Sequence, residues 1–199
     1  MLRSLVGSEM CIRDRSEAKH ELQQVANGGA RLLYTRFCSS FTGPDDADLP
    51  WAAVCWGASR IPRSSYTSIQ ALTDSLPTLD RLKQRGLHFA NRCSLCKTEE
   101  ESSRHLFFAC SYSMQVWGSV LAHLGIRRIM RSGRQEARWI FMRSLRKNFK
   151  AKLASLFTLS IYSIWQERNL RIFNERERDT DNVVQDILQT AALRCEAFV

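Results

Sequence analysis

The sequence predicts a mostly α fold, and three observations support this prediction. Apolar residues recur at helical spacing along most of the chain. Only 9 glycines and 4 prolines interrupt 199 residues. Three cysteines and one histidine fall between residues 93 and 110, a grouping typical of a closed tetrahedral zinc site. We therefore expect a small Cys3His zinc-nucleated module packed with amphipathic helices.

Composition limits the class of protein. The length suits one ordinary domain or two small ones. No run of about 18 apolar residues is present, so we expect no membrane partner. The net charge of +9 favours an anionic partner, although a basic surface can also serve only solubility. Seven cysteines, an odd number and partly clustered, argue against a disulfide framework. We expect an intracellular protein, nuclear or cytoplasmic and not secreted.

The chain divides into segments by composition. Residues 6–15 resemble a translated library adapter, so we exclude residues 1–15 as an adapter-derived artefact, and the true N-terminus would then be missing. Residues 42–50 hold a glycine, two prolines and three acids, which indicates a loop and a boundary. The expected organisation is an artefact at 1–15, a helical extension and loop at 16–49, a cysteine-bearing domain at 50–125, and a basic helix, a buried helix and a C-terminal helix at 126–199.

The first elements of the cysteine-bearing domain are short. Residues 51–56 form an apolar run that suits either a strand or the start of a helix. After Pro62, we expect Ser64 or Ser65 to cap a helix that runs to Ser75.

The next elements lead to the cysteines. Thr78 is expected to cap a helix that ends at Gly86. Residues 87–90 should form a short extended segment, and His88 within it is an alternative metal ligand, or a histidine with a surface or core role.

The candidate metal ligands are Cys93, Cys96, His105 and Cys110. Zn²⁺ takes four tetrahedral ligands from thiolates and imidazoles, and a site closed by four protein ligands is structural. The alternative is a set of buried thiols and a core histidine, or a redox pair at the C-x2-C. Four such residues this close in sequence favour the metal.

A short helix should carry the second half of this ligand set. Ser102 or Ser103 can cap a helix over residues 104–108. An unbroken helix would carry Cys110 partly off the His105 face. We therefore expect the helix to end near Ala109, so that Cys110 turns back towards the ion.

Features beyond the cysteines carry a family resemblance. They are Trp51, Trp56, Ile61-Pro62-Arg63, Leu76-Pro77-Thr78-Leu79-Asp80-Arg81-Leu82, Gly86, Glu101-Ser102, His105-Leu106-Phe107-Phe108 and Trp117. In order and spacing, residues 50–120 resemble the reverse transcriptase zinc-binding domain (zf-RVT type) of plant-type non-LTR (LINE-like) retrotransposons. Ile164-Trp165-Gln166-Glu167-Arg168-Asn169 is a second similarity, whereas Ser65-Tyr66-Thr67-Ser68 departs from the family. The resemblance implies structural Zn²⁺ as cofactor and the rest of a retroelement polyprotein as partner.

A core helix is predicted after the ligands. Its apolar residues recur at helical spacing and should face the core: Met114, Trp117, Val120, Leu121 and Leu124. Gly125 should end this helix.

Residues 127–152 hold ten basic residues and one acid, Glu136, a local net charge equal to that of the whole chain. With apolar residues interleaved, they predict one amphipathic helix with a cationic face. This face is either only a solvated charged surface, or it contacts the phosphates of RNA or DNA without recognising particular bases. The candidate nucleic-acid-binding residues are Arg127, Arg128, Arg131, Arg134, Arg138, Arg143, Arg146, Lys147 and Lys150.

The rest of the chain is helical by pattern. Residues 153–165 are apolar on all sides, which indicates a buried central helix. The chain then turns polar from Glu167 to Asp179. Thr180 or Asp181 should cap a final helix.

Catalytic chemistry is not indicated. Asp45-Asp46 lies in a Gly-Pro loop, so the carboxylates of a polymerase, ribonuclease H or endonuclease are not apparent. We expect no enzyme and no small-molecule substrate. The leading hypothesis is a zinc-stabilised, non-catalytic accessory segment of a retrotransposon reverse transcriptase. The alternatives are a structural or protein-interaction module that braces the polyprotein, and a decayed retroelement fragment without function.

Overall fold

The computed structural model describes residues 52–55, 60–86, 91–143 and 145–196. Within these ranges the chain forms eight helices and one isolated β-bridge, so the mostly α prediction is confirmed. The expectations for residues 1–51, for Trp56 and for residues 87–90 with His88 lie outside the described residues. The helices are α2 (Ala52–Cys55), α3 (Pro62–Leu72), α4 (Leu79–Gln84), α5 (Ser103–Phe108), α6 (Ser111–His123), α7 (Gly133–Met142), α8 (Lys147–Phe173) and α9 (Thr180–Glu196).

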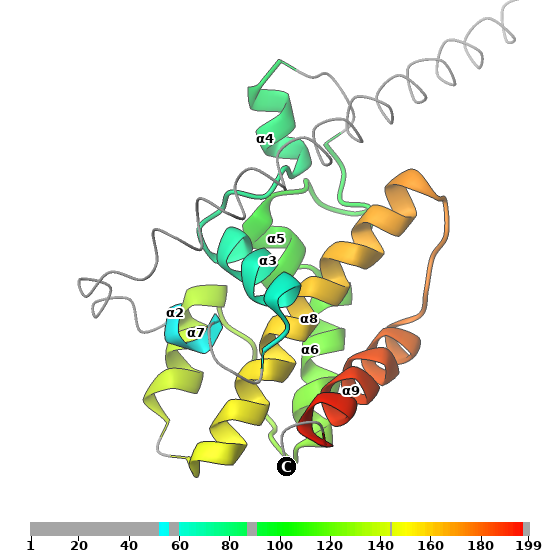
Figure 1. The fold of residues 1–199 in the computed structure, drawn as a ribbon. Coiled ribbons are helices and arrows are strands. Elements are labelled where there is room, and N and C mark those ends of the chain that lie inside the picture. The colour runs from blue at the N-terminus through cyan, green and yellow to red at the C-terminus, as the bar shows by residue number, and fades with distance from the viewer. Residues whose placement is uncertain (1–51, 56–59, 87–90, 144, 197–199) are drawn as a thin grey trace, which may run out of the picture.

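The long helix α8 is the centre of the fold. Figure 1 shows it crossing the molecule, and α3, α6, α7 and α9 pack against it. Its middle is buried on all sides, as predicted, with Leu153, Leu156, Phe157, Ile161 and Ile164 in the core. The helix continues beyond the apolar segment to Phe173. No helix in the described part of the chain is both long and apolar enough to span a membrane.

Helix α3 begins earlier than predicted. Pro62 occupies its first turn, and Ile61 is the N-cap, so the prediction that Ser64 or Ser65 caps it is wrong. Proline has a suitable fixed φ and lacks the N–H that this position would leave without a partner. The Ser64 hydroxyl instead donates to the Ile61 carbonyl at 2.8 Å. The helix ends at Leu72, short of Ser75.

Helix α4 follows the prediction more closely. Thr78 is its N-cap residue, but its hydroxyl donates to the Asp80 carboxylate instead of accepting a backbone N–H. The chain leaves the helix through Gly86, whose φ of 88° is in the left-handed region that favours glycine.

In α6, one predicted core residue is wrong. Met114 is 40 % exposed, and Ser113 is buried in the stripe that contacts the core. The Ser113 hydroxyl donates to the Leu106 carbonyl of α5, so a polar residue is satisfied at that position. Trp117 is buried as predicted, and Gly125, with φ of 71°, follows the helix end.

The basic segment is two helices joined at an angle, so the prediction of one helix over residues 127–152 is wrong. Residues 125–132 form a loop, α7 covers ten residues, and Arg143 is extended before α8 begins at Lys147. Glu136 explains the loop because its buried carboxylate accepts from the Arg131 backbone N–H at 2.9 Å and from the Trp117 indole at 3.3 Å. A buried carboxylate needs such partners, and here the Arg131 backbone of the loop and the Trp117 side chain of α6 supply them.

Candidate metal centre

The first two ligands lie on a hairpin-like turn. The Cys93 N–H donates to the Glu99 carbonyl at 2.8 Å, and the Glu101 N–H donates to the Asn91 carbonyl at 2.8 Å. Lys97 reverses the chain with a φ of 60°, and its N–H donates to the Cys93 carbonyl at 2.9 Å. This turn places the sulfurs of Cys93 and Cys96 on the same side.

The other two ligands follow from a capped, interrupted helix. The Ser102 side chain accepts from the His105 N–H at 3.1 Å, which fixes the start of α5 as predicted. Helix α5 ends at Phe108 with Ala109 as its C-cap, also as predicted. The Cys110 N–H then donates to the His105 carbonyl at 2.7 Å. The chain thus turns back, and Cys110 becomes the N-cap residue of α6.

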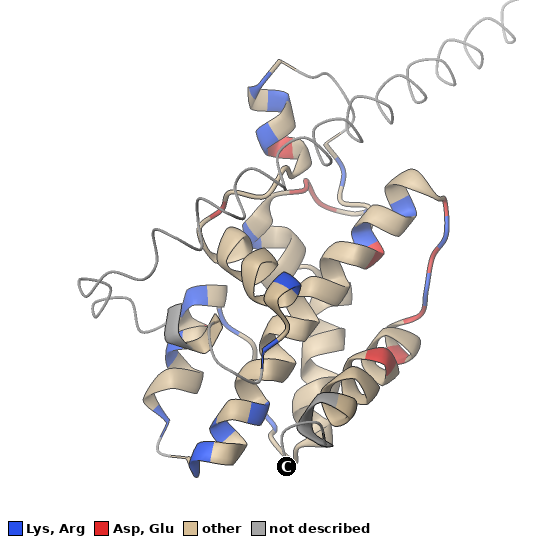
Figure 2. Cartoon of the chain, viewed as in Figure 1, with Lys and Arg blue, Asp and Glu red and all other residues tan. Residues whose placement is uncertain are grey.

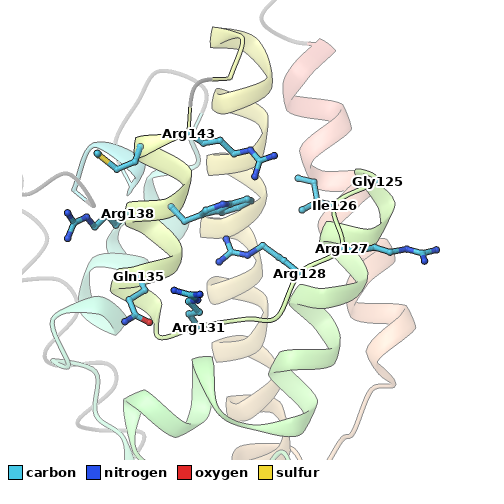
Figure 3. Close-up of a pocket in the computed structure, with 10 residues that line it drawn as sticks. Gly125, Ile126, Arg127, Arg128, Arg131, Gln135, Arg138 and Arg143 are labelled. Atoms are coloured by element: carbon cyan, nitrogen blue, oxygen red, sulfur yellow. The ribbon is translucent and has the colours of Figure 1, made fainter.

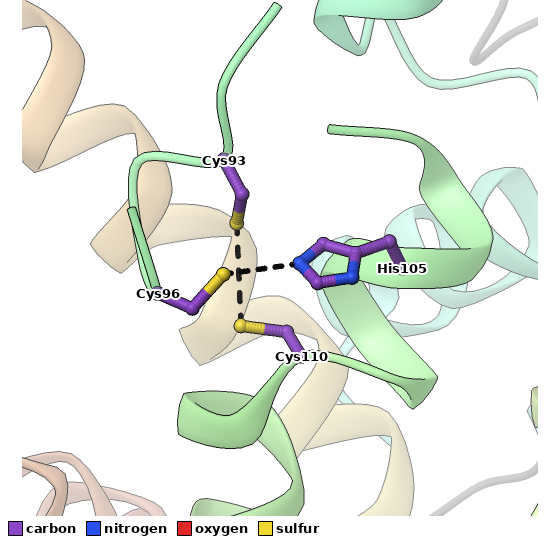
Figure 4. A group of neighbouring side chains, drawn as sticks. All are labelled: Cys93, Cys96, His105 and Cys110. Carbon is purple, nitrogen blue, oxygen red and sulfur yellow. Dashed lines mark hydrogen bonds between the residues drawn. The ribbon is translucent and has the colours of Figure 1, made fainter. Parts of the chain in front are cut away.

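The four side chains converge on one point (Figure 4). Cys93 Sγ lies 4.0 Å from Cys110 Sγ, and Cys96 Sγ lies 3.3 Å from His105 Nε2. All four ligand atoms lie within 4.8 Å of one another. Tetrahedral zinc with usual bond lengths would set these separations at about 3.5–3.8 Å. The cluster therefore fits one metal ion after a contraction of about 1 Å along its longest edge.

Two of the three sulfurs, those of Cys96 and Cys110, are biased towards carrying negative charge. The hydrogen bond from the Cys93 thiol lowers the pKa of Cys110 to about 5 and raises that of Cys93 far above its usual range. Burial acts to raise the pKa of Cys96, but hydrogen bonds from the Thr98 hydroxyl and from the Glu99 and Thr98 backbone lower it overall. Thiolates gathered in this way favour a cation between them.

The histidine presents the correct nitrogen to the cluster. Its Nε2 faces Cys96, and its Nδ1 lies 3.1 Å from the exposed Glu99 carboxylate without forming a hydrogen bond in this geometry. Burial acts to lower the His105 pKa, but the hydrogen bond to Cys96 and the charges of Cys110, Cys96 and Glu99 raise it overall. A carboxylate behind a ligating histidine is a common outer partner in zinc sites.

Two arginines of α8 hold the turn in place, and the sequence prediction missed both. The Arg171 guanidinium donates to the Ser94 and Leu95 carbonyls at 3.3 and 2.9 Å. The Arg168 guanidinium forms a buried ion pair with Glu101, N···O 2.7 Å, at the end of the same turn. Arg168 lies in the Ile164–Asn169 motif, so that motif was the available signal.

Residues 35–117 match the family zf-RVT, zinc-binding in reverse transcriptase. The resemblance predicted from the sequence is thereby confirmed for this zf-RVT segment, which contains all four candidate ligands. The comparison with curated proteins found no match, and neither did the comparison with solved structures. The arginines that hold the turn lie C-terminal to the zf-RVT segment, on α8.

The predicted nucleic-acid residues lie outside the zf-RVT segment, around α7. Figure 2 shows basic residues gathered on α7 and the start of α8, and acidic residues near α4, the turn and α9. Five of the predicted arginines line one groove of about 740 Å³, together with Gln135, Trp139 and Met142 (Figure 3): Arg127, Arg128, Arg131, Arg138 and Arg143. We call this the arginine groove.

The other four predicted residues lie outside the groove lining. Arg134 donates to the Leu72 carbonyl at 3.0 Å, so it serves the fold. Lys150 donates to the Phe141 carbonyl. Arg146 and Lys147 are exposed at the start of α8, where they extend the basic surface from the groove.

Proposed function

We propose that this chain is a zinc-stabilised, non-catalytic accessory segment of a non-LTR retrotransposon reverse transcriptase, and that its basic surface contacts RNA or DNA phosphates. The observation that supports it best is the convergence of four sulfur and nitrogen ligands inside the zf-RVT segment. The rest of the retroelement polyprotein is the expected partner.

The donor set suits zinc in a structural role. Three thiolates and one imidazole are the ligands of closed tetrahedral zinc sites. Cys93, Cys96, His105 and Cys110 would fill all four positions and leave none for substrate. Bound zinc would supply folding free energy, on the order of 10 kcal/mol in isolated fingers. It would hold the turn to the start of α5 and α6.

Metal analysis of the purified full chain tests the zinc proposal. We expect one zinc per chain by elemental analysis, and a large loss of zinc in Cys93→Ser and His105→Ala. Cys55→Ser is the matched control, because Cys55 is a buried free cysteine outside the cluster. Folded wild-type protein without stoichiometric zinc, or equal loss in the control, would refute the proposal.

Phosphate contact is supported by the segregation of charge. Between residues 102 and 166 the one acid is Glu136, and its buried carboxylate already pairs with Arg128 at 3.1 Å. The remaining basic side chains of the groove thus face solvent without a nearby carboxylate on α7. Such a surface binds polynucleotide phosphates with a strong dependence on salt.

Charge reversal separates this proposal from a purely structural role. We expect the full chain to bind a labelled RNA strand in fluorescence anisotropy, with affinity that falls as salt rises. A triple variant should abolish that binding if it carries Glu in place of Arg143, Arg146 and Lys147. The same reversal at three exposed residues remote from the groove should change it little: Lys83, Arg85 and Arg176. Unchanged binding in the first triple variant would favour the protein-interaction alternative.

A further inference from the structure

The arginine groove contains one arginine that is held by an ion pair and others that are not. Arg128 is held by its ion pair with Glu136, and its guanidinium lies 3.8 Å from the centre of the Trp139 ring. Arg143 lies over the same ring at 5.2 Å. Figure 3 shows Arg128, Arg131 and Arg143 reaching into the groove, and Arg127 and Arg138 pointing outward at its sides. The groove thus combines stacked guanidiniums at its centre with cations at its rim.

Apart from Arg128, the arginines of the groove are not neutralised by any carboxylate among the residues that the structure describes. In the described part of the chain, no salt bridge involves Arg131 or Arg143, and the same holds for Arg127 and Arg138. Four guanidiniums are therefore available to an anionic ligand with several charges.

The surface around these cations is also apolar. Among the described residues, five large hydrophobic side chains are exposed, and three of them lie between residues 129 and 142. They are Ile129 at 84 %, Phe141 at 36 % and Met142 at 65 % exposed. Of these three, Met142 lines the groove together with Trp139, whereas the centre of the Phe141 ring lies 4.8 Å from Lys150 Nζ and outside the groove lining. Exposed apolar side chains beside unpaired arginines suit a ligand that offers both negative charge and flat apolar faces.

We propose that the arginine groove binds a single-stranded polynucleotide, with phosphates on its free arginines and unpaired bases against its apolar rim. This inference rests on the proposed phosphate contact. A duplex hides its base faces in the helical stack and would leave the exposed Met142 side chain in water. A single strand exposes those faces, which stack on aromatic side chains and on arginine guanidiniums.

Charge alone predicts the opposite preference, which makes the inference testable. Duplex DNA has the higher charge density and the steeper salt slope per phosphate. A surface that reads only phosphates should bind the duplex at least as tightly as either strand. Stacking is sequence-tolerant, and loss of one stacking partner weakens binding by about tenfold.

The experiment is fluorescence anisotropy with the full chain at fixed salt. The probes are labelled 12-nucleotide RNA and DNA strands of one sequence, the matching RNA and DNA duplexes, and an abasic DNA strand of equal length. We expect the single strands to bind about tenfold more tightly than the duplexes. The abasic strand should bind about tenfold more weakly than the normal DNA strand. The ratio of the two single-strand affinities shows whether the groove prefers RNA or DNA.

Variants locate the effect in the groove. Met142→Ser should weaken single-strand binding about tenfold and leave duplex binding unchanged. Met114→Ser is the matched control, because Met114 is 40 % exposed on α6 and outside the groove. Circular dichroism melting confirms that each variant is folded.

The outcomes distinguish failure of the single-strand inference from failure of the proposed phosphate contact. Duplexes that bind as tightly as single strands, or an abasic strand that binds as tightly as a normal one, would overturn the single-strand inference and leave phosphate contact intact. Absence of salt-dependent binding to every probe would overturn the phosphate contact and the inference together.

Discussion

Replacement of Arg168 with Met should strongly destabilise the protein. The Arg168 side chain is 2 % exposed and the Glu101 side chain 0 % exposed. Glu101 Oε1 accepts from Arg168 Nη2 at 2.7 Å and from the Leu79 backbone N–H at 3.0 Å. Methionine would keep most of the volume and remove the charge. Glu101 would then be a buried carboxylate with one remaining donor.

The expected cost follows from this burial. Removal of one partner of a buried pair costs about 3–5 kcal/mol, because the other charge stays without compensation. Since domains of this size are stable by about 5–15 kcal/mol, the loss is a large fraction of the total. At about 2–4 °C per kcal/mol, the melting temperature should fall by roughly 6–20 °C.

The assay is urea unfolding at neutral pH with zinc in excess, followed by circular dichroism. Lys97→Ala is the control: it removes an ion pair with Glu177 whose side chains are 61 % and 53 % exposed, so the midpoint should not move. The double variant Glu101→Gln, Arg168→Met should recover part of the stability, because no buried charge remains unpaired. A loss below about 1 kcal/mol for Arg168→Met would refute the reasoning.

Three further predictions concern the backbone and one carboxylate. Gly133→Ala should destabilise the protein by about 1–3 kcal/mol in thermal melts, because its Cβ would lie 2.1 Å from the Phe108 ring. Gly118→Ala should instead stabilise the protein by about 0.5–1 kcal/mol, because Gly118 lies within a helix and its Cβ would meet open space. Ser102→Ala should cost about 1 kcal/mol in urea unfolding, and Ser102→Thr should cost less, since both native and Thr hydroxyls can cap α5. Burial acts to raise the Glu167 pKa, but bonds from the Arg178 backbone and from two guanidiniums lower it overall, below 4.5. The ionised form of Glu167 therefore stabilises the fold above pH 4.5, and this stabilisation is lost as pH falls through the lowered pKa. Glu167→Gln should make the free energy of unfolding fall less steeply over that pH range. An unchanged pH profile would contradict this assignment.

The match between sequence and structure is best around the ligands. The pairing of Cys93 with Cys96, the Ser102 cap and the helix end near Ala109 are each set by a few neighbouring residues. Cap chemistry and ligand spacing act within one or two turns, so they can be read without the fold. The left-handed Gly125 just after the end of α6 belongs to the same class.

One of the wrong predictions has a local cause, and the other has a long-range cause. Ser64 and Ser65 are acceptable cap residues, but Pro62 starts α3 earlier and both serines are buried. Met114 has helical spacing with the core, but the packing of α6 turns Ser113 inward, where the Leu106 carbonyl accepts its hydroxyl. The start of α3 was thus set by the neighbouring Pro62, whereas in α6 a distant surface selected which face of the helix is buried.

The sequence alone determined the set of candidate ligands, the helical class and the apolar centre of α8, because these depend on residue type and short spacing. The tertiary structure decided which charged side chains are buried and which groups they pair with. Glu101 meets Arg168 from 67 positions away, and the Leu95 carbonyl meets Arg171 from 76 positions away. Glu136 likewise bends the basic segment into a loop and a groove. A buried charge must find a partner wherever the fold supplies one, and no local pattern specifies where that is.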